Sequence, residues 1–373
     1  MKNMRRTEGD SPGTVPERQY GTLSYNLNRD CPRAVPNLAQ RSSAMRLGVI
    51  GVGSMGRNHA RIYSELPGVQ LVGICDIDKR RAIEVAATYG TVPYTDYMEL
   101  LRKGLDGVSV VVPTHLHKEV ALNAIEAGVN VLIEKPIADT VANAQRIFYA
   151  AEQRNLKLMV GHIERFNPAV GALYRIIESG RYGRLLGVST LRLAPYPVRV
   201  VDSGIILDVG CHDIDIIAYL AGSVIREVYA IASSTIHHLE DNALLSLNLE
   251  SGIVGHIEIS WLSNIKVRKL FASLEGALAL LDFIDQTLVL YDEESEQPQE
   301  IEHAEPLKEE LKCFVECLNN GMRPPVSGDE SIHALGVALG AIESYQRNLP
   351  MRIRGDGAFD FLAEVVRENE GEG

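Results

Sequence analysis

The fold of this chain is decided by residues 46–56, RLGVIGVGSMG. The stretch opens as a short apolar run, which is typical of a buried parallel strand, and continues directly into a glycine-rich turn. In such a turn Gly51 allows the tight bend, Gly53 lets the backbone approach a pyrophosphate, and Gly56 allows close packing of the following helix on the strand. The phosphates would rest on the N-terminus of that helix. The stretch therefore predicts a dinucleotide-binding Rossmann domain.

A second apolar strand, residues 70–75, ends in Asp76. An acidic side chain about twenty residues past the glycine turn binds the ribose hydroxyls of NAD. Lys79, Arg80 and Arg81 follow and offer positive charge for the 2′-phosphate of NADP, which is the alternative cofactor. Because Asp76 would repel that phosphate, we predict NAD. We expect Ser54 and Met55 of the glycine turn to contact it as well.

The first part of the chain alternates strands and helices. Further apolar runs at residues 107–112 and 129–133 predict buried strands, and the segment 117–128 between them predicts a crossover helix. This order is typical of a doubly wound parallel sheet, so the N-terminal domain is predicted to be α/β.

After about residue 160 the pattern changes to strands with alternating hydrophobicity. Residues 244–249 and 254–261 are two such strands, and Glu250-Ser251-Gly252 between them is a hairpin signal. We therefore predict an α+β domain with a large, mostly antiparallel sheet. A final apolar helix at 332–345 is expected to pack back on the first domain.

These patterns divide the chain. The predicted parts are an extension without a fold or a mis-assigned start at 1–44, a Rossmann domain at 45–160, a substrate and assembly domain at 161–330, a helical segment at 331–350 and a tail at 351–373.

Length, charge and cysteines limit the functions open to the chain. Its 373 residues, 46% of them hydrophobic, exceed one typical domain. A net charge of −12 without a compensating basic stripe argues against nucleic acid and anionic membranes as partners. An anionic substrate must then meet locally clustered arginines. The five cysteines have no CxxC pair or disulfide spacing, which favours a reducing, cytoplasmic location.

A cation, a carboxylate and an imidazole follow the fingerprint, at Lys135, Asp208 and His212. Lys135 comes directly after the apolar strand 131–133, at the edge of the sheet where ligands of open α/β folds bind. A helical advance of 100° per residue places Asp208, His212 and Asp215 on one face. Histidine suits general-base work near neutral pH, and a carboxylate orients its ring. We expect Asp208 to be this carboxylate, with Asp215 as a second candidate.

An aspartate and a histidine four residues apart on a helix are more often a surface pair worth a few tenths of a kcal/mol. Lys135, held in a fixed turn by Pro136, favours catalysis instead. The three residues predict alcohol dehydrogenase chemistry: His212 removes the hydroxyl proton while a nicotinamide takes the hydride, and Lys135 stabilises the alkoxide or shares the base role.

Residues 45 to about 350 resemble the glucose-fructose oxidoreductase/inositol dehydrogenase (Gfo/Idh/MocA) family. The matching segments are the glycine turn at 51–56, PTHLH at 113–117, EKP at 134–136 and DVGCHD at 208–213. The resemblance implies a Rossmann domain and a second domain whose open sheet serves dimer or tetramer assembly. It also implies a cis-proline at Pro136.

The same resemblance assigns roles residue by residue. Lys135, Asp208 and His212 match positions that act on the sugar hydroxyl being oxidised. The positions on the cofactor side are Pro113, Thr114, His117, Glu134 and Lys135.

Two further segments, at 161–170 and 192–197, resemble the branch of UDP-N-acetylglucosamine 3-dehydrogenases, which act on this nucleotide sugar or its uronic acid. Arginines there offer forks for a pyrophosphate or carboxylate, with a surface salt bridge as the alternative for each. We expect the C3 hydroxyl between Lys135 and His212, and a 3-keto sugar as product. The predicted substrate-binding residues are Arg165, Asn167, Arg192, Tyr196 and Arg199.

Other functions lack their signatures or compete less well. Histidines beside carboxylates at 162–164 and 237–240 have no four-ligand spacing, so we expect no metal site. The competing functions are a dehydrogenase of inositol or free sugars, an NAD-dependent glycoside hydrolase of the same fold, and a non-catalytic NAD-binding regulator. The intact Lys135, Asp208 and His212 disfavour the regulator.

Overall fold

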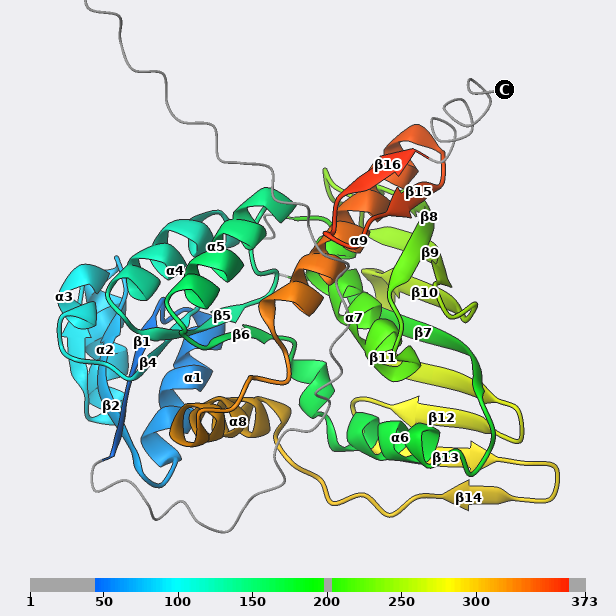
Figure 1. Ribbon diagram of the computed structural model, residues 1–373, viewed down its shortest axis with the longest axis horizontal. Coiled ribbons are helices and arrows are strands. Elements are labelled where there is room, and N and C mark those ends of the chain that lie inside the picture. The colour runs from blue at the N-terminus through cyan, green and yellow to red at the C-terminus, as the bar shows by residue number, and fades with distance from the viewer. Residues whose placement is uncertain (1–43, 198–202, 362–373) are drawn as a thin grey trace, which may run out of the picture.

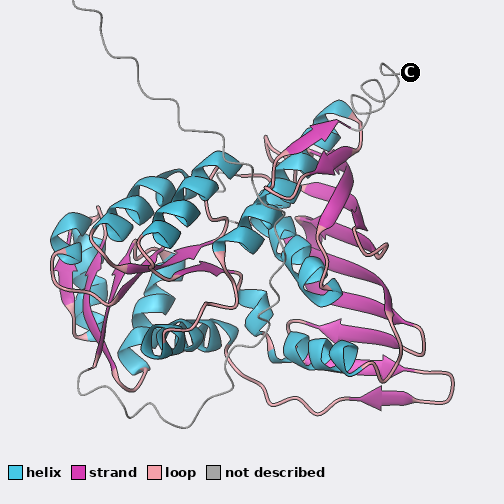
Figure 2. Cartoon of the chain, viewed as in Figure 1, coloured by secondary structure: helices cyan, strands magenta, loops and turns pink. Residues whose placement is uncertain are grey.

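The computed structural model describes residues 44–197 and 203–361, which form two sheets flanked by helices (Figure 1). Helices α7 (Cys211–Ala221) and α9 (Gly328–Arg347) lie between the two sheets and contact each other (Figure 2). Within this described part, no helix has the length and apolarity needed to cross a membrane. The predicted class, a Rossmann domain followed by an α+β domain, is confirmed.

The first sheet is entirely parallel, with strand order β3-β2-β1-β4-β5-β6. This is the doubly wound Rossmann order. The chain first adds strands on one side of β1 and then, from β4 on, on the other side, so that the strand order reverses between β1 and β4. Its strands are β1 Met45–Ile50, β2 Val69–Cys75, β3 Val92–Tyr94, β4 Gly107–Val110, β5 Asn130–Glu134 and β6 Leu158–Gly161. The helices around it are α1 Ser54–Glu65, α2 Lys79–Tyr89, α3 Tyr97–Leu101, α4 His117–Glu126 and α5 Val141–Gln153, with a short 3-10 turn at Thr114–Leu116.

The second sheet has ten strands in the order β14-β13-β12-β11-β7-β10-β9-β8-β15-β16. Only the β7–β10 pair among them is parallel. The strands are β7 Leu185–Pro195, β8 Ile225–Ser233, β9 Asn242–Leu249, β10 Val254–Ser260, β11 Leu262–Leu274, β12 Leu278–Asp282, β13 Thr287–Tyr291 and β14 Glu296–Pro298, with β15 and β16 at the edge. The predicted hairpin between β9 and β10 is confirmed, with Gly252 in the left-handed region at φ +83°.

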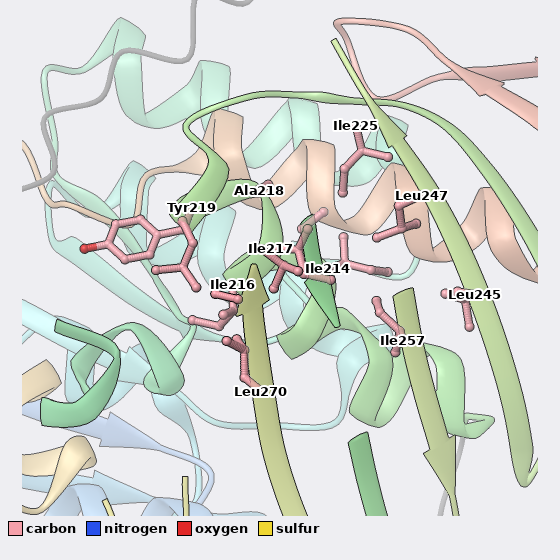
Figure 3. Close-up of a cluster of buried hydrophobic side chains, with 14 of the residues drawn as sticks. Ile214, Ile216, Ile217, Ala218, Tyr219, Ile225, Leu245, Leu247, Ile257 and Leu270 are labelled. Carbon is pink, nitrogen blue, oxygen red and sulfur yellow. The ribbon is translucent and has the colours of Figure 1, made fainter. Parts of the chain in front are cut away.

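One face of the second sheet is covered by helices and carries the larger core. Helix α7, Cys211–Ala221, packs Ile214 and Ile217 against strand residues such as Leu247 and Ile257 (Figure 3). Helix α6, Pro168–Ser179, covers β12 and β13 on the same side. Alternate residues of β8 to β12 point to the opposite face, which these helices leave open.

Two C-terminal helices join the domains. Helix α8, Pro306–Asn320, returns to the Rossmann domain and packs against α1. Helix α9, Gly328–Arg347, contacts both α5 and β8. It starts at Gly328, earlier than the predicted residue 332, because Ser327 and Glu330 form a capping box.

The predicted tail at 351–373 was wrong in its first part. Met351–Ile353 forms β15 and Phe359–Phe361 forms β16, and β15 pairs with β8 at the edge of the second sheet. The predicted extension at 1–44 and the end of the tail fall almost wholly outside the described residues.

Candidate active site

A cavity of about 500 Å³ opens at the carboxyl ends of the Rossmann strands. Ligands of open α/β folds bind at this edge, where the strand order reverses. Eight predicted site residues line the cavity: Gly51, Gly53, Met55, Asp76, Pro113, Glu134, Lys135 and Asp208. Cofactor-side candidates thus share one cavity with Lys135 and Asp208, whereas His212 is not among the residues that line it.

The glycine turn is built as predicted. Gly51 adopts φ +88°, and a Cβ on Gly56 would lie 1.9 Å from the backbone oxygen of Gly51, so no larger residue fits at Gly56. A Cβ on Gly53 would meet nothing within 4 Å. This open space at the start of α1 fits a pyrophosphate on the helix N-terminus. Ser54 is exposed in the first turn of α1 and does not line the cavity.

Asp76 lies buried at the end of β2 and is tied to the glycine turn. Its carboxylate accepts hydrogen bonds from the backbone N–H of Val52 at 3.0 Å and of Asp78 at 2.9 Å. Arg81 donates to both of its oxygens, at 3.2 and 3.3 Å. Asp76 therefore faces the cavity in a fixed position, and the guanidinium of Arg81 is paired with it.

Glu134, at the end of β5, is held by a histidine that the sequence reasoning missed. Nε2 of His59, on the buried face of α1, lies 3.0 Å from Oε1 of Glu134. The backbone N–H of Lys135 donates to the other oxygen at 3.2 Å. Burial opposes ionisation of Glu134, but the hydrogen bond from His59 and the charge of Lys135 lower its pKa. His59 carried a weak signal, a polar residue on the apolar face of an amphipathic helix.

The structure corrects the prediction that His117 contacts the cofactor. Its ring is buried, with Nδ1 at 2.9 Å from the carbonyl oxygen of Pro136 and Nε2 at 2.8 Å from that of Val112. Burial lowers the pKa of His117. His117 thus ties α4 to Pro136, directly after the cis Lys135-Pro136 bond, and neither it nor Thr114 lines the cavity.

Lys135 and Asp208 form the centre of the site. Nζ of Lys135 donates to Oδ1 of Asp208 at 3.0 Å and to its backbone oxygen at 2.6 Å. Burial opposes the charge on Lys135, but Asp208, together with Cys211 and Glu134, outweighs burial and raises the pKa of the lysine. Lys135 is therefore a cation at neutral pH.

Asp208 lies in a single π-helical segment, Ile206–Gly210, directly before α7. Such segments recur at functional sites. The prediction of one regular helical face for Asp208, His212 and Asp215 was therefore wrong, because the π segment changes the angular spacing. Asp208 contacts Lys135, and Asp215 binds Arg165 instead of His212.

His212 lies at the start of α7, with Nδ1 buried and without a hydrogen-bond partner within the described ranges. Burial and the charges of Lys135, Arg192, His162 and Arg268 lower its pKa well below the usual value. The imidazole is therefore neutral near pH 7 and able to accept a proton. The predicted hydrogen bond from its ring to the Asp208 carboxylate is replaced by the Lys135–Asp208 pair.

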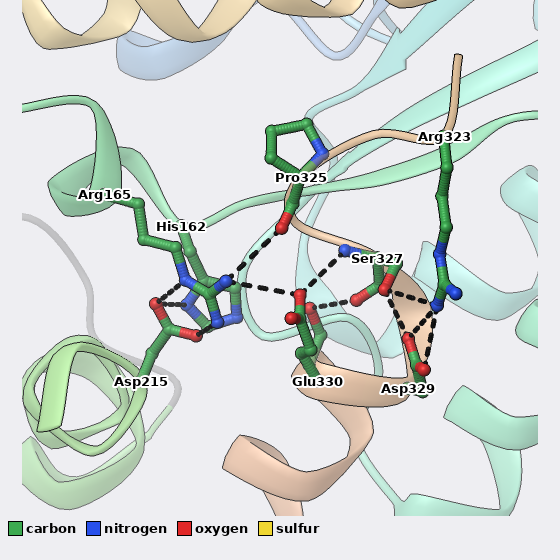
Figure 4. A network of polar contacts seen from close by, with 9 residues as sticks. His162, Arg165, Asp215, Arg323, Pro325, Ser327, Asp329 and Glu330 are labelled. Atoms are coloured by element: carbon green, nitrogen blue, oxygen red, sulfur yellow. Dashed lines mark hydrogen bonds and ion pairs between the residues drawn. The ribbon is translucent and has the colours of Figure 1, made fainter. Parts of the chain in front are cut away.

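Arg165 serves the structure rather than the substrate, which corrects its predicted role. It donates to Asp215 at 2.5 and 2.7 Å, to Glu330 at 3.2 Å and to the backbone oxygen of Pro325 at 3.3 Å (Figure 4). Its side chain is 5% exposed. Arg165 thus joins α7 to the N-terminus of α9.

Arg192 is also buried in ion pairs. Nε donates to Asp213 and Nη1 to Glu164, both at 2.8 Å, while Nη2 is buried without a partner in the part of the chain described. Two of its three guanidinium nitrogens are thus engaged by carboxylates of the protein and one is left over, so the predicted contact with the substrate stays a prediction.

The remaining substrate-side predictions fare differently. Asn167 is buried and caps α6, accepting from the N–H of Ala169 at 3.1 Å and donating to Phe283 at 3.0 Å, which corrects its predicted role. Tyr196 packs its ring against Trp261 and His237, with centroids 5.7 and 5.5 Å apart. Arg199 lies outside the described residues.

Among residues 44–197 and 203–361, no group of three or more His, Cys, Asp or Glu side chains is arranged to hold a metal ion.

Comparison with known proteins matches two parts of the chain to two family models. Residues 45–162 match the model described as an oxidoreductase family with an NAD-binding Rossmann fold, and residues 170–273 match the Gfo/Idh/MocA C-terminal domain.

Among relatives, the UDP-N-acetylglucosamine 3-dehydrogenase of Acidithiobacillus ferrooxidans is 34% identical over 66% of this chain and 77% of its own length. A solved structure of that dehydrogenase superposes with a TM-score of 0.77, covering 82% of this chain and 98% of the other. The scyllo-inositol 2-dehydrogenase (NAD(+)) of Bacillus subtilis is 27% identical over 83% of this chain and 96% of its own. The chain belongs to the Gfo/Idh/MocA family of oxidoreductases and is a nicotinamide-dependent dehydrogenase.

Proposed function

We propose that the protein oxidises a ring hydroxyl of a sugar to a ketone with NAD as hydride acceptor, and that this sugar is a UDP-N-acetylhexosamine or its uronic acid, attacked at C3. The observation that carries the chemistry is the pairing of a cationic Lys135 with Asp208 beside the neutral His212. A hydroxyl held between a cation and a neutral imidazole has both requirements for loss of its proton.

The cofactor fits the residues present. Gly53 leaves room for a pyrophosphate at the N-terminus of α1, and Asp76 faces the cavity where ribose hydroxyls would lie. We favour NAD over NADP because Arg81, the cation nearest to Asp76, is already paired with that carboxylate. When bound, the nicotinamide supplies the acceptor for the hydride.

The protein side chains divide the remaining work. His212 takes the hydroxyl proton, because its pKa is lowered and its ring is neutral. Lys135 stays protonated and stabilises the negative charge that develops on the oxygen. Asp208 holds Lys135 through two hydrogen bonds and so fixes the direction of its Nζ.

The substrate class rests on similarity to a relative that acts on UDP-N-acetylglucosamine. When the solved structure of this relative is superposed on the present structure, nearly the whole chain of the relative is matched. An inositol dehydrogenase is similar to a larger share of this chain, at lower identity. This similarity supports a free polyol as the second candidate substrate.

The test is production of NADH from NAD⁺ with UDP-N-acetylglucosamine, its uronic acid, myo-inositol and glucose in parallel. Absorbance of NADH should rise with one or both UDP sugars. A rise with inositol or glucose alone would refute the nucleotide-sugar substrate. Absence of NADH together with release of free sugar would indicate the glycoside hydrolase instead.

We also propose that the protein is a cytoplasmic homo-oligomer assembled through the open face of the second sheet. Ile231 and Leu244, cross-strand neighbours on that face, are 59% and 51% exposed, and Val254 and Leu278 are exposed there too. Apolar groups gathered on one face support a protein contact. The four described cysteines are free, which agrees with a reducing compartment.

A further inference from the structure

A group of cations lies beside His212 on the helix-covered face of the second sheet. Arg192 on β7 and Arg268 on β11 are direct cross-strand partners. Both act on the pKa of His212, which places them within electrostatic reach of the imidazole. Lys266 precedes Arg268 by two residues on the same strand and feels the charges of both arginines.

The carboxylates around these cations do not balance them. Glu164 is shared by two guanidinium groups, lying 2.8 Å from Nη1 of Arg192 and 3.5 Å from Nη1 of Arg268. Asp213 contacts Arg192 alone, at 2.8 Å. Asp208, the third carboxylate that acts on Arg268, is already paired with Lys135. Two carboxylates therefore remain for three cations, and Lys266 has no ion pair with any residue the structure describes.

One hydrogen-bond donor in this group of cations also lacks an acceptor among the described residues. Nη2 of Arg192, a side chain 3% exposed, is buried without a partner in the described residues. A buried guanidinium N–H without an acceptor is costly. Arg268, at 40% side-chain exposure, remains open to a ligand.

Repulsion among the positive charges of Arg192, Arg268 and Lys266 makes this group of cations unfavourable. Burial and the charge of Arg192 lower the pKa of Arg268, and the charge of Arg268 is the largest cause that lowers the pKa of Lys266. An added oxyanion would relieve this repulsion and would give acceptors to the free N–H groups.

We propose that Arg192, Arg268 and Lys266 form an anion subsite for an oxyanion carried by the substrate, either its sugar carboxylate or its diphosphate. The proposal rests on the proposed function, because it assumes that a sugar ring lies at Lys135 and His212. It makes Arg268 and Lys266 determinants of specificity, which sequence reasoning did not identify.

Equilibrium binding to the NADH-loaded protein tests the subsite without turnover. The ligands are UDP-N-acetylglucosamine, its uronic acid, UDP and glucuronate, titrated by calorimetry into wild type, Arg268→Gln, Lys266→Gln and the double variant. Lys269→Gln is the matched control. The substitution removes one positive charge from the position next to Arg268 on β11, where the side chain lies on the opposite face of the sheet. Arg192 is left intact, since breaking a buried ion pair would destabilise the fold.

Arg268→Gln should raise the Kd of the anionic ligand about tenfold, or about 1.4 kcal/mol, with a further rise in the double variant. A rise confined to the uronic acid and glucuronate assigns the subsite to the carboxylate. An equal rise for both UDP sugars and UDP assigns it to the diphosphate. Lys269→Gln should leave every Kd unchanged.

The proposal is overturned if the double variant binds as wild type does, or if Lys269→Gln weakens binding equally. A different binding result would refute the proposed nucleotide-sugar substrate. A wild type that binds no UDP sugar but binds glucuronate through Arg268 would refute the nucleotide sugar and keep the subsite. A wild type that binds neither the UDP compounds nor glucuronate would refute both.

Discussion

The ionisation of Lys135 and His212 is set by their neighbours. Asp208 keeps the lysine charged despite burial, while the surrounding cations and burial keep the imidazole neutral. The two side chains would therefore enter the reaction already in the states that alkoxide stabilisation and proton removal require.

Replacing Lys135 with methionine should abolish most catalysis, and loss of its ion pair with Asp208 should lower the melting temperature. The substitution keeps an unbranched side chain but removes the cation, so we expect kcat to fall by about 10²–10³, as for loss of an oxyanion-stabilising group. Stopped-flow or steady-state NADH formation measures this. NADH affinity, measured by fluorescence, should change little, and a variant that keeps wild-type kcat would contradict the role of Lys135.

The pH dependence of kcat/KM should show no histidine inflection near the usual value of 6.5. Because the pKa of His212 is lowered, the proton-accepting form is lost only at more acidic pH. Because the pKa of Lys135 is raised above 10.5, the cation is lost only at more alkaline pH. The profile between these values should be flat, and an inflection near 6.5 that disappears in His212→Asn would contradict this assignment.

Sequence alone identified Lys135, Asp208 and His212 as candidates but not the contacts among them. The ion pairs of Arg165 and Arg192 were not predictable, because no pattern along the chain shows that Asp215, Glu330 and Glu164 fold against them. Asn167 did carry a signal: an asparagine directly before Pro168 is typical of a helix N-cap with proline at the first turn.

At the scale of elements, the strand, turn and helix at 45–65 provide a paired test of the glycines. Gly56→Ala should destabilise the protein by about 1–3 kcal/mol, because the new Cβ would overlap the backbone oxygen of Gly51. Gly53→Ala should leave the melting temperature unchanged, because nothing lies within 4 Å of its Cβ.

The same Gly53→Ala variant should nevertheless bind NAD at least about tenfold more weakly, since a methyl group would stand where the pyrophosphate approaches. Thermal melting and NADH fluorescence titration separate the two effects. Wild-type affinity in Gly53→Ala would show that the phosphates do not rest on this turn.

Elements with long periodic patterns were predictable and short or irregular ones were not. The buried strands β1, β4 and β5 are continuous apolar runs, which parallel sheets require. Strands β15 and β16 have only three residues each; they pair with each other, and only β15 pairs with β8, far away in sequence. The π segment before α7 has no sequence signature, whereas the capping box at Ser327 and Glu330 was readable and marks the start of α9.

At the scale of the whole molecule, the open face of the ten-stranded sheet predicts assembly. Leu244→Asp should place a charge in the contact and lower the molar mass in solution, measured by light scattering on a size-exclusion column. Ile83→Asp, at a half-exposed isoleucine on α2, is the matched control and should leave the mass unchanged. A monomeric wild type, or a variant with wild-type mass, would contradict assembly through this face.

The central claim is direct hydride transfer from C3 of a nucleotide sugar, and deuterium at that carbon tests it most directly. The measurement is mass spectrometry of the NADH formed from NAD⁺ and UDP-N-acetylglucosamine, or its uronic acid, labelled with deuterium at C3. We expect one deuterium in the reduced nicotinamide and a 3-keto sugar as the other product. Unlabelled NADH, or no NADH at all from either sugar, would contradict it.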